Sequence, residues 1–209
     1  LLDGQAETLR SRFEEAYWSE EIGTYALALD RDKRQCRVRT SNAGHALFSG
    51  IAATDRAERV AATLMDAMSF SGWGIRTLAT SEPRYNPMSY HNGSIWPHDN
   101  ALVAMGLARY GHAEAAARVF QGLFDAAADT DLRRLPELFC GFPRRRSRSP
   151  VSYPVACSPQ AWASATLPGL LSATIGLRFV PQRNEIRFER PVLPAFLEEV
   201  ELRGLKVGN

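Results

Sequence analysis

Apolar residues recur at three- and four-residue spacing over most of this chain, and this periodicity restricts the fold more than any other feature. Three segments show it as amphipathic helices, at about residues 3–18, 54–68 and 112–128. Between them lie segments that begin with polar or aromatic residues and continue with small apolar ones, from Ser41, Ser94 and Ser158. Their starts are roughly fifty to sixty residues apart. The alternation predicts helical hairpins in which a half-exposed outer helix covers a buried inner one.

Polar residues and prolines predict where several of these helices begin. Thr54 is expected to cap its helix through its hydroxyl. Ser158 is expected to cap the last inner helix, with Pro159 at the first helical position, where its missing N–H costs nothing. Pro97 fits the first turn of the middle inner helix, with Ser94 as a candidate cap.

The last part of the chain has a different pattern. After Gly176, apolar residues alternate with charged ones, and prolines interrupt the run. The alternating residues are Ile186, Phe188, Val200, Leu202, Leu205 and Val207. This period of two predicts a small antiparallel β appendage of two to four short strands. The expected organisation is therefore three α-hairpins over residues 1–176, followed by the appendage over residues 177–209.

Composition excludes several classes of function. The chain has 209 residues, with 25 Lys and Arg against 23 Asp and Glu, so its charge does not indicate nucleic acid as a partner. Its three cysteines show no metal-ligand spacing and suit the reducing cytoplasm. No apolar run is long enough to predict a membrane span, and no leader peptide is visible. The arginine-rich segment 143–150 is expected to be a solvated loop.

Three hairpins by themselves make an open half-ring. Such a half-ring leaves a long apolar face exposed, and monomers rarely expose patches beyond a few hundred Å². We therefore expect this chain to be the C-terminal half of an (α/α)6 six-hairpin toroid, an all-α fold. Its partner would be the N-terminal half of the same barrel. The polar entrances of the inner helices would form the rim of a central cup, where the functional site is expected.

Three motifs at these entrances carry a resemblance to a known family. YHNGSIWPHDNALVA, RLPELFCGF and YPVACSPQAWA follow one another in this order. They resemble the C-terminal part of bacterial amylo-α-1,6-glucosidase or glycogen-debranching-like proteins. These belong with the six-hairpin glycosidases, which include mannosylglycerate-hydrolase-like domains. The resemblance implies an inverting glycoside hydrolase that acts on α-glucosidic bonds and needs no metal or cofactor.

Glu137 is the candidate catalytic residue. It follows a proline and lies between apolar residues, so partial burial is expected to raise the pKa of its carboxyl group. In the enzymes that the chain resembles, a glutamate after the aromatic-rich inner helix activates water, and Glu137 has that place. An exposed loop glutamate or a helix-capping partner is the alternative. A matching general acid is not recognisable here, so it is expected upstream of Leu1, and residues 1–209 alone are expected to be inactive.

Aromatic and polar side chains near the entrances indicate sugar recognition. Aromatic faces stack on the apolar face of a pyranose, while amide, imidazole and carboxylate groups bond its hydroxyls. The candidate binding residues are Trp73, Tyr90, His91, Asn92, Trp96, His98, Asp99, Gln160 and Trp162. Asp99 is expected to orient the substrate or bind a hydroxyl, and Arg76 shares the loop of Trp73.

Several of these residues also have a purely structural interpretation. Trp73, Trp96 and Trp162 are equally typical of packing between helices, and His98 of a histidine bonded to a neighbouring helix. Gln160 suits a helix cap, and His45 suits a core or capping role more than a place in the cup. Zinc binding by His91, His98 and Asp99 has weak support, because the spacing is not H-E-x-x-H.

Two other functions remain open from the sequence. A non-catalytic carbohydrate-binding half-barrel would explain why no general acid is recognisable. A sugar epimerase or polysaccharide lyase on the same toroid would use His or Tyr as its base. The fold does not separate these functions. Glu137 does, because only a hydrolase needs it to activate water.

Overall fold

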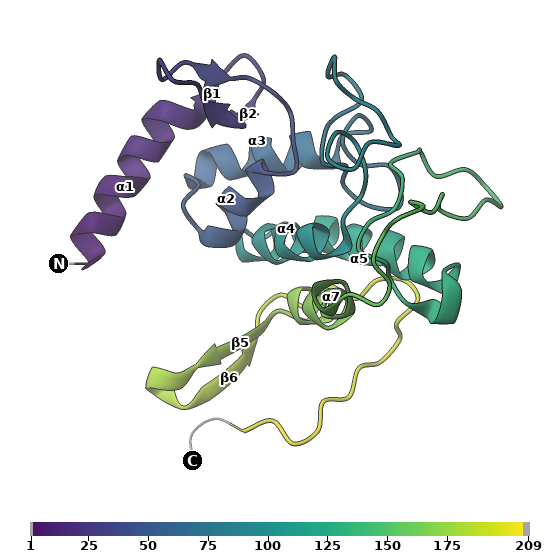
Figure 1. Ribbon diagram of the computed structural model, residues 1–209. Helices are drawn as coiled ribbons and strands as arrows, with labels where there is room; N and C mark the ends of the chain where they lie inside the picture. The colour runs from purple at the N-terminus through teal and green to yellow at the C-terminus, as the bar shows by residue number, and fades with distance from the viewer. Residues whose placement is uncertain (1, 207–209) are drawn as a thin grey trace.

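The computed structural model of the chain describes residues 2–206 and is mainly helical (Figure 1). The helices are α1 (Leu2–Tyr17), α2 (Ala43–Ser49), α3 (Thr54–Met65), α4 (Pro97–Arg109), α5 (Ala113–Ala128), α6 (Ala161–Ser164) and α7 (Thr166–Thr174), with 3-10 turns η1 (Asp131–Arg133) and η2 (Pro181–Arg183). The antiparallel strand pairs are β1 (Trp18–Ser19) with β2 (Thr24–Tyr25), β3 (Ala28–Leu29) with β4 (Gln35–Cys36), and β5 (Leu177–Val180) with β6 (Glu185–Phe188). The predicted all-α fold with a small antiparallel β appendage is confirmed.

The helices form an inner and an outer layer. Helix α4 lies between α2 and α7, and α5 packs against both α4 and α7 (Figure 1). The outer helices bury the apolar stripes that their periodicity predicts. Helix α3 buries Val60 and Leu64, and α5 buries Val119, Phe120 and Leu123. The alternation of amphipathic and small-apolar helices in the sequence therefore corresponds to the two layers.

Two glycines let the inner helices α2 and α4 approach closely. A Cβ atom on Gly106 would lie 2.6 Å from the backbone nitrogen of Phe48, and one on Gly44 would lie 2.5 Å from a methyl carbon of Val103. Both distances are shorter than real Cβ contacts allow. The small residues of the inner helices therefore set the spacing between neighbouring hairpins.

Two of the predicted helix caps are absent. Helix α3 starts at Thr54 itself, and its N-cap is Ala53, whose N–H donates to the Glu14 carboxylate of α1 at 2.6 Å. The prediction that Thr54 caps this helix is wrong because a carboxylate from another helix occupies the position. Ser158 is also not a cap, since α6 begins at Ala161 after Gln160.

The remaining helix-start predictions have mixed outcomes. Pro97 opens α4 as predicted, after Trp96 as N-cap. Ser94 does not cap α4, because its hydroxyl donates to the backbone oxygen of Tyr90 at 2.7 Å. Pro159 lies before α6 rather than in its first turn, since the helix begins only after Gln160, whose backbone is extended.

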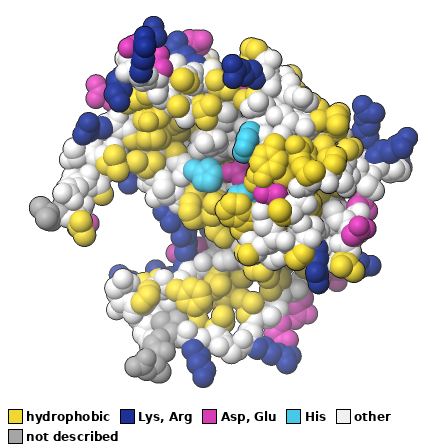
Figure 2. Space-filling model, viewed as in Figure 1, with side chains coloured by type: hydrophobic (Ala, Val, Ile, Leu, Met, Phe, Trp, Pro, Cys, Tyr) yellow, Lys and Arg dark blue, Asp and Glu magenta, His cyan; other side chains and the backbone are white. Residues whose placement is uncertain are grey.

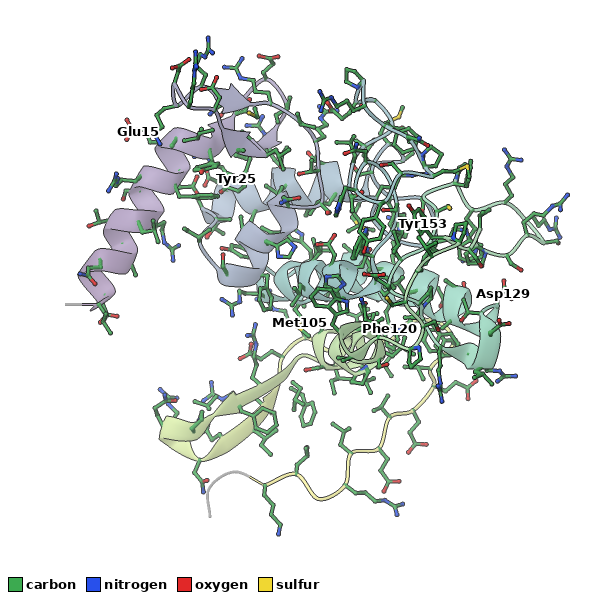
Figure 3. All side chains as sticks on the ribbon, in the orientation of Figure 1. Glu15, Tyr25, Met105, Phe120, Asp129 and Tyr153 are labelled. Carbon is green, nitrogen blue, oxygen red and sulfur yellow. The ribbon has the colours of Figure 1, made fainter. Side chains whose placement is uncertain are left out.

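Helix α1 is attached to the rest of the chain at only one end. No residue of α1 is fully buried, and Leu9 of its apolar stripe is 61% exposed. Near its C-terminal end, Glu14 accepts a hydrogen bond of 2.6 Å from the Tyr25 hydroxyl and pairs with Arg56 of α3. Figure 3 shows Tyr25 at this junction of α1 with the first strands. Phe13 and Tyr17 of the apolar stripe pack against the core, so only the N-terminal part of the stripe, with Leu9, is exposed.

The tail contains a hairpin followed by an extended segment. In β5–β6, Leu177 pairs with Phe188 and Val180 with Glu185. Residues 189–206 contain no strand, but Phe196 packs parallel to the ring of Phe124 on α5, with 3.8 Å between ring centroids. Val207, placed in the predicted alternation, lies outside the described residues. The division at residue 176 stays a prediction.

Candidate active site

A ladder of backbone contacts brings residues 90–99 and 137 together. Ile95 and Phe139 exchange two backbone hydrogen bonds, of 2.9 and 3.0 Å. Ile95 lies directly before the start of α4, and Phe139 lies two residues after Glu137, so the pairing sets Glu137 beside the N-terminal end of α4. The segments cross very closely: a Cβ atom on Gly141 would lie 1.7 Å from the backbone oxygen of Gly93.

The Glu137 carboxylate receives a hydrogen bond on each oxygen. The Tyr90 hydroxyl donates to Oε1 at 2.7 Å, and the Cys157 N–H donates to Oε2 at 3.1 Å. The backbone N–H of Glu137 donates to the Cys157 oxygen at 2.9 Å, which fixes this segment further. Glu137 is 7% exposed. The carboxylate is therefore both buried and held by two segments that are distant in sequence.

These donors lower the pKa of Glu137 below its ordinary value of 4.5. The hydrogen bond from Tyr90 is the main cause, the Cys157 N–H adds to it, and burial opposes both. The prediction of a raised pKa is wrong, because the apolar neighbours in sequence indicate burial but not the donors that folding supplies. Glu137 is consequently ionised at neutral pH.

Aromatic rings surround Tyr90 and form what we call the aromatic wall, consisting of Tyr90, His91, Trp96 and Tyr153. Edge-to-face contacts join the Tyr90 ring to His91 (4.7 Å between centroids), Trp96 (4.9 Å) and Tyr153 (5.6 Å). The Trp96 indole N–H donates to the Tyr90 backbone oxygen at 3.1 Å. Figure 3 shows Tyr153 among the loops beside the helices. Tyr153 opens the YPVACSPQAWA motif but is not among the predicted binding residues.

His98 lies between two tryptophans. Its ring is parallel to that of Trp162 at 4.3 Å and edge-to-face with that of Trp96 at 5.7 Å. Burial lowers the pKa of His98, and its Nδ1 is buried with no hydrogen-bond partner among the described residues. The Gln160 side chain accepts from the Trp162 indole N–H, and Gln160 contributes to the lowered pKa of Glu137. The contact of His98 with Trp162 brings the first turns of α4 and α6 together.

A second acidic group lies at the same end of the inner helices. Asp99 in the first turn of α4 bonds the Nε2 of His45 in α2 through Oδ1, at 2.6 Å. This hydrogen bond raises the pKa of His45. Asp99 is only 9% exposed, and its Oδ2 has no hydrogen-bond partner among the described residues. The expectation that His45 has a core or capping role is wrong: 43% of its side chain is exposed, and Asn42 is the N-cap of α2.

The space-filling view shows these groups together. In Figure 2, histidine and acidic side chains gather at the centre of the visible face, next to a large hydrophobic area. Among the described residues, no three His, Cys, Asp or Glu side chains are placed to hold a metal ion. The arrangement combines an ionised carboxylate, aromatic surfaces and buried polar atoms still able to bond a ligand, which are the groups that a sugar site requires.

Two of the predicted binding residues lie elsewhere. Trp73 is 5% exposed and packs under the guanidinium of Arg144, 4.4 Å from its ring centroid. Its neighbour Arg76 is 2% exposed and donates to the Gly141 oxygen at 2.6 Å, so this loop packs inside the protein instead of lining the cup. Asn92 is exposed in a turn, where its N–H donates to Ser89 Oγ at 3.2 Å.

Of the site residues outside the predicted set, His45 is the one that the sequence could best have identified. It stands in the first turn of α2, as Asp99 does in α4, and neighbouring inner helices bring such positions together. Tyr153 and Cys157 lie in the YPVACSPQAWA motif, but the sequence does not place them beside Glu137, because that depends on how residues 151–157 pair with residues 137–140.

Solved structures with the same fold confirm the predicted toroid. A mannosylglycerate hydrolase of glycoside hydrolase family 63 from Thermus thermophilus, in complex with glucose, aligns with a TM-score of 0.55 at 23% identity. The alignment covers 75% of this chain and 34% of that protein. Neutral trehalase Nth1 from Saccharomyces cerevisiae aligns with a TM-score of 0.60 at 15% identity, over 82% of this chain and 30% of that protein. Both are six-hairpin glycosidases.

Sequence relatives identify the family. Mannosylglycerate hydrolases MGH1 and MGH2 from Selaginella moellendorffii are each 36% identical over 73 residues. The matched region is 35% of this chain and 15% of each relative. Residues 1–140 match the family described as the mannosylglycerate hydrolase MGH1-like glycoside hydrolase domain. With two thirds of its length matched, the chain belongs to this MGH1-like glycoside hydrolase domain family.

Proposed function

We propose that the protein hydrolyses glycosidic bonds, with Glu137 as the general base that activates water. One observation carries this proposal: the Glu137 carboxylate is held by hydrogen bonds from Tyr90 and Cys157 beside the aromatic wall. A base must be ionised at the working pH, and the lowered pKa of Glu137 meets that condition. A general acid would need a raised pKa, so the base is the role that fits.

We further propose an inverting mechanism with the general acid on a part of the protein outside residues 1–209. Inverting enzymes place two carboxyl groups roughly 6.5–9.5 Å apart, with water between one of them and the sugar. Asp99 is already bonded to His45, which suits it to orient the substrate or bind a hydroxyl rather than donate a proton. The exposed Leu9 on the N-terminal part of α1 supports a further proposal, that the other half of the barrel covers this face.

The proposed substrates are α-linked glycosides. The motifs resemble those of amylo-α-1,6-glucosidase-like proteins, which supports a branch-point α-glucosidic bond. The relatives named mannosylglycerate hydrolases favour a second candidate, a small α-mannoside. We propose that His91, Trp96, His98, Asp99, Gln160 and Trp162 bind the sugar, because they lie around Glu137.

Replacement of the base tests the proposed function. In the full-length protein, Glu137→Gln is expected to lower kcat by about a thousandfold, because the amide accepts no proton from water. Binding of the sugar, measured by calorimetry, should persist. Glu15→Gln on exposed α1 is the matched control and should leave kcat unchanged. Unchanged hydrolysis in Glu137→Gln would exclude the assignment, and a product released with retained configuration would exclude inversion.

A further inference from the structure

Tyr90 is the residue of the aromatic wall that touches the proposed base. Its hydroxyl donates to Glu137 Oε1 at 2.7 Å. From this geometry we infer that Tyr90 is a positioning residue, which orients the Glu137 carboxylate and keeps it ionised instead of binding the sugar. The inference rests on the proposed function of Glu137. It replaces the sugar-binding role that the sequence predicts for Tyr90.

Tyr90 is held in place through both its ring and its backbone. Three aromatic rings lie within 5.6 Å of its ring centroid, from His91, Trp96 and Tyr153. Its backbone oxygen accepts from the Ser94 hydroxyl at 2.7 Å and from the Trp96 indole N–H at 3.1 Å. Stacking on a pyranose requires a free ring face. The crowded Tyr90 ring is better suited to hold its hydroxyl in one place.

One hydrogen-bond donor to Glu137 precedes it in the sequence and the other follows it. Together they orient its carboxylate. Tyr90 bonds Oε1, and the N–H of Cys157 bonds Oε2. An ionised carboxylate has about four acceptor sites, so one bond on each oxygen leaves capacity for a water molecule. Without the Tyr90 hydroxyl, the contact that holds Oε1 in place is gone. A general base must hold its geometry to activate water efficiently.

The charges around Glu137 support this role. The titratable groups near Glu137 are Tyr90, Cys157 and His98, and Tyr153 lies next to Tyr90. The hydrogen bond to Glu137 raises the pKa of Tyr90 to about 12, and the same bond is the main cause of the lowered pKa of Glu137. The proton therefore stays on Tyr90 at neutral pH, and the carboxylate keeps its charge.

Tyr90→Phe tests the inference because it removes the hydroxyl and keeps the ring. The probes are α-mannosyl fluoride and α-glucosyl fluoride, since fluoride leaves with little protonation and the reaction then reports mainly on the base. In the full-length protein, we expect Tyr90→Phe to lower kcat about tenfold with little change in KM. The acidic limb of the kcat/KM profile should move up by about one pH unit. Tyr17→Phe on α1, which keeps its ring contact with Phe13, is the matched control and should change neither value.

The outcomes separate this inference from the proposed function. If Glu137→Gln is inactive while Tyr90→Phe keeps the acidic limb of the wild type, the positioning role is wrong and the hydrolase assignment stands. A raised KM with unchanged kcat in Tyr90→Phe would also overturn it, because it would show sugar binding. Full activity in Glu137→Gln would instead remove the proposed function. Titration of the Glu137 carboxyl by carbon NMR provides a readout that requires no turnover, and an unchanged pKa in Tyr90→Phe would contradict the inference.

Discussion

His45 and Asp99 belong to different inner helices, and their hydrogen bond of 2.6 Å joins the first turns of α2 and α4. Asp99 raises the pKa of His45 above its ordinary value of 6.5, because the carboxylate favours the protonated ring. The pair is thus a site where pH acts on the coupling between two hairpins. The raised pKa of His45 therefore determines whether this pair stabilises the protein more at low or at high pH.

We predict that His45→Gln destabilises the protein more at pH 5.5 than at pH 8.5. A raised pKa in the folded state adds stability that is complete below the unfolded value of about 6.5 and is lost as pH rises through the folded value. His45 is half exposed, so the difference between the two pH values should be at most about 1 kcal/mol. Urea unfolding of both proteins at each pH measures it. A destabilisation that grew with pH would contradict the assigned pairing.

For the single residue Glu137, the sequence predicted the position in the chain better than the charge state. It placed Glu137 as the candidate base but predicted a raised pKa, since only the apolar neighbours of this residue are visible in the sequence. The Tyr90 hydroxyl and the Cys157 N–H reverse the sign, and they come from 47 and 20 residues away. Hydrogen-bond donors supplied by folding therefore decided the protonation state.

Among the elements, the crossing of α2 and α4 depends most on single residues. Gly106 faces the α2 backbone at the point where the two helices meet. The sequence indicates this interface only as a run of small residues in both segments. The closeness of the crossing explains why these residues are small, and it leads to a stability prediction.

We predict that Gly106→Ala lowers the free energy of unfolding by about 2 kcal/mol. Alanine favours a helix over glycine by about 1 kcal/mol, but overpacking at a contact with rigid backbone costs up to about 3 kcal/mol or more. The control is Gly4→Ala in α1, where a Cβ atom meets nothing within 4 Å, and stability should be unchanged or slightly higher. Denaturant unfolding of both variants and the wild type measures these free energies of unfolding. Equal stability of Gly106→Ala and the wild type would show that α2 moves away freely.

For the whole molecule, the described residues make an open arrangement of hairpins. Helix α1 and the β5–β6 hairpin both extend from the body to the left of the view, α1 above and the hairpin below (Figure 1). The chain covers about a third of the solved mannosylglycerate hydrolase that it resembles in fold. An incomplete ring brings one wall of the site together without the residues that would face it.

We predict that residues 1–209 expressed alone bind a sugar weakly and do not hydrolyse it. The chain supplies the proposed base and the aromatic wall, and the proposed general acid belongs to another part of the protein. Calorimetry with mannose and glucose, together with an assay of reducing-sugar release, checks both halves of the prediction. Hydrolysis by this chain that depends on Glu137 would show that its general acid lies within residues 1–209.

The sequence by itself determined the helical hairpins, their inner and outer layers, and the stretch of chain that carries the candidate site. These features follow from local periodicity and from residues such as Pro97, whose backbone preference needs no partner. Tertiary structure alone decided that Trp73 packs inside the protein, that His45 reaches Asp99, and that Tyr90 holds Glu137. The physical reason is that burial, hydrogen-bond donors and charge neighbours depend on segments far apart in the chain, whereas helix periodicity is written within a few turns.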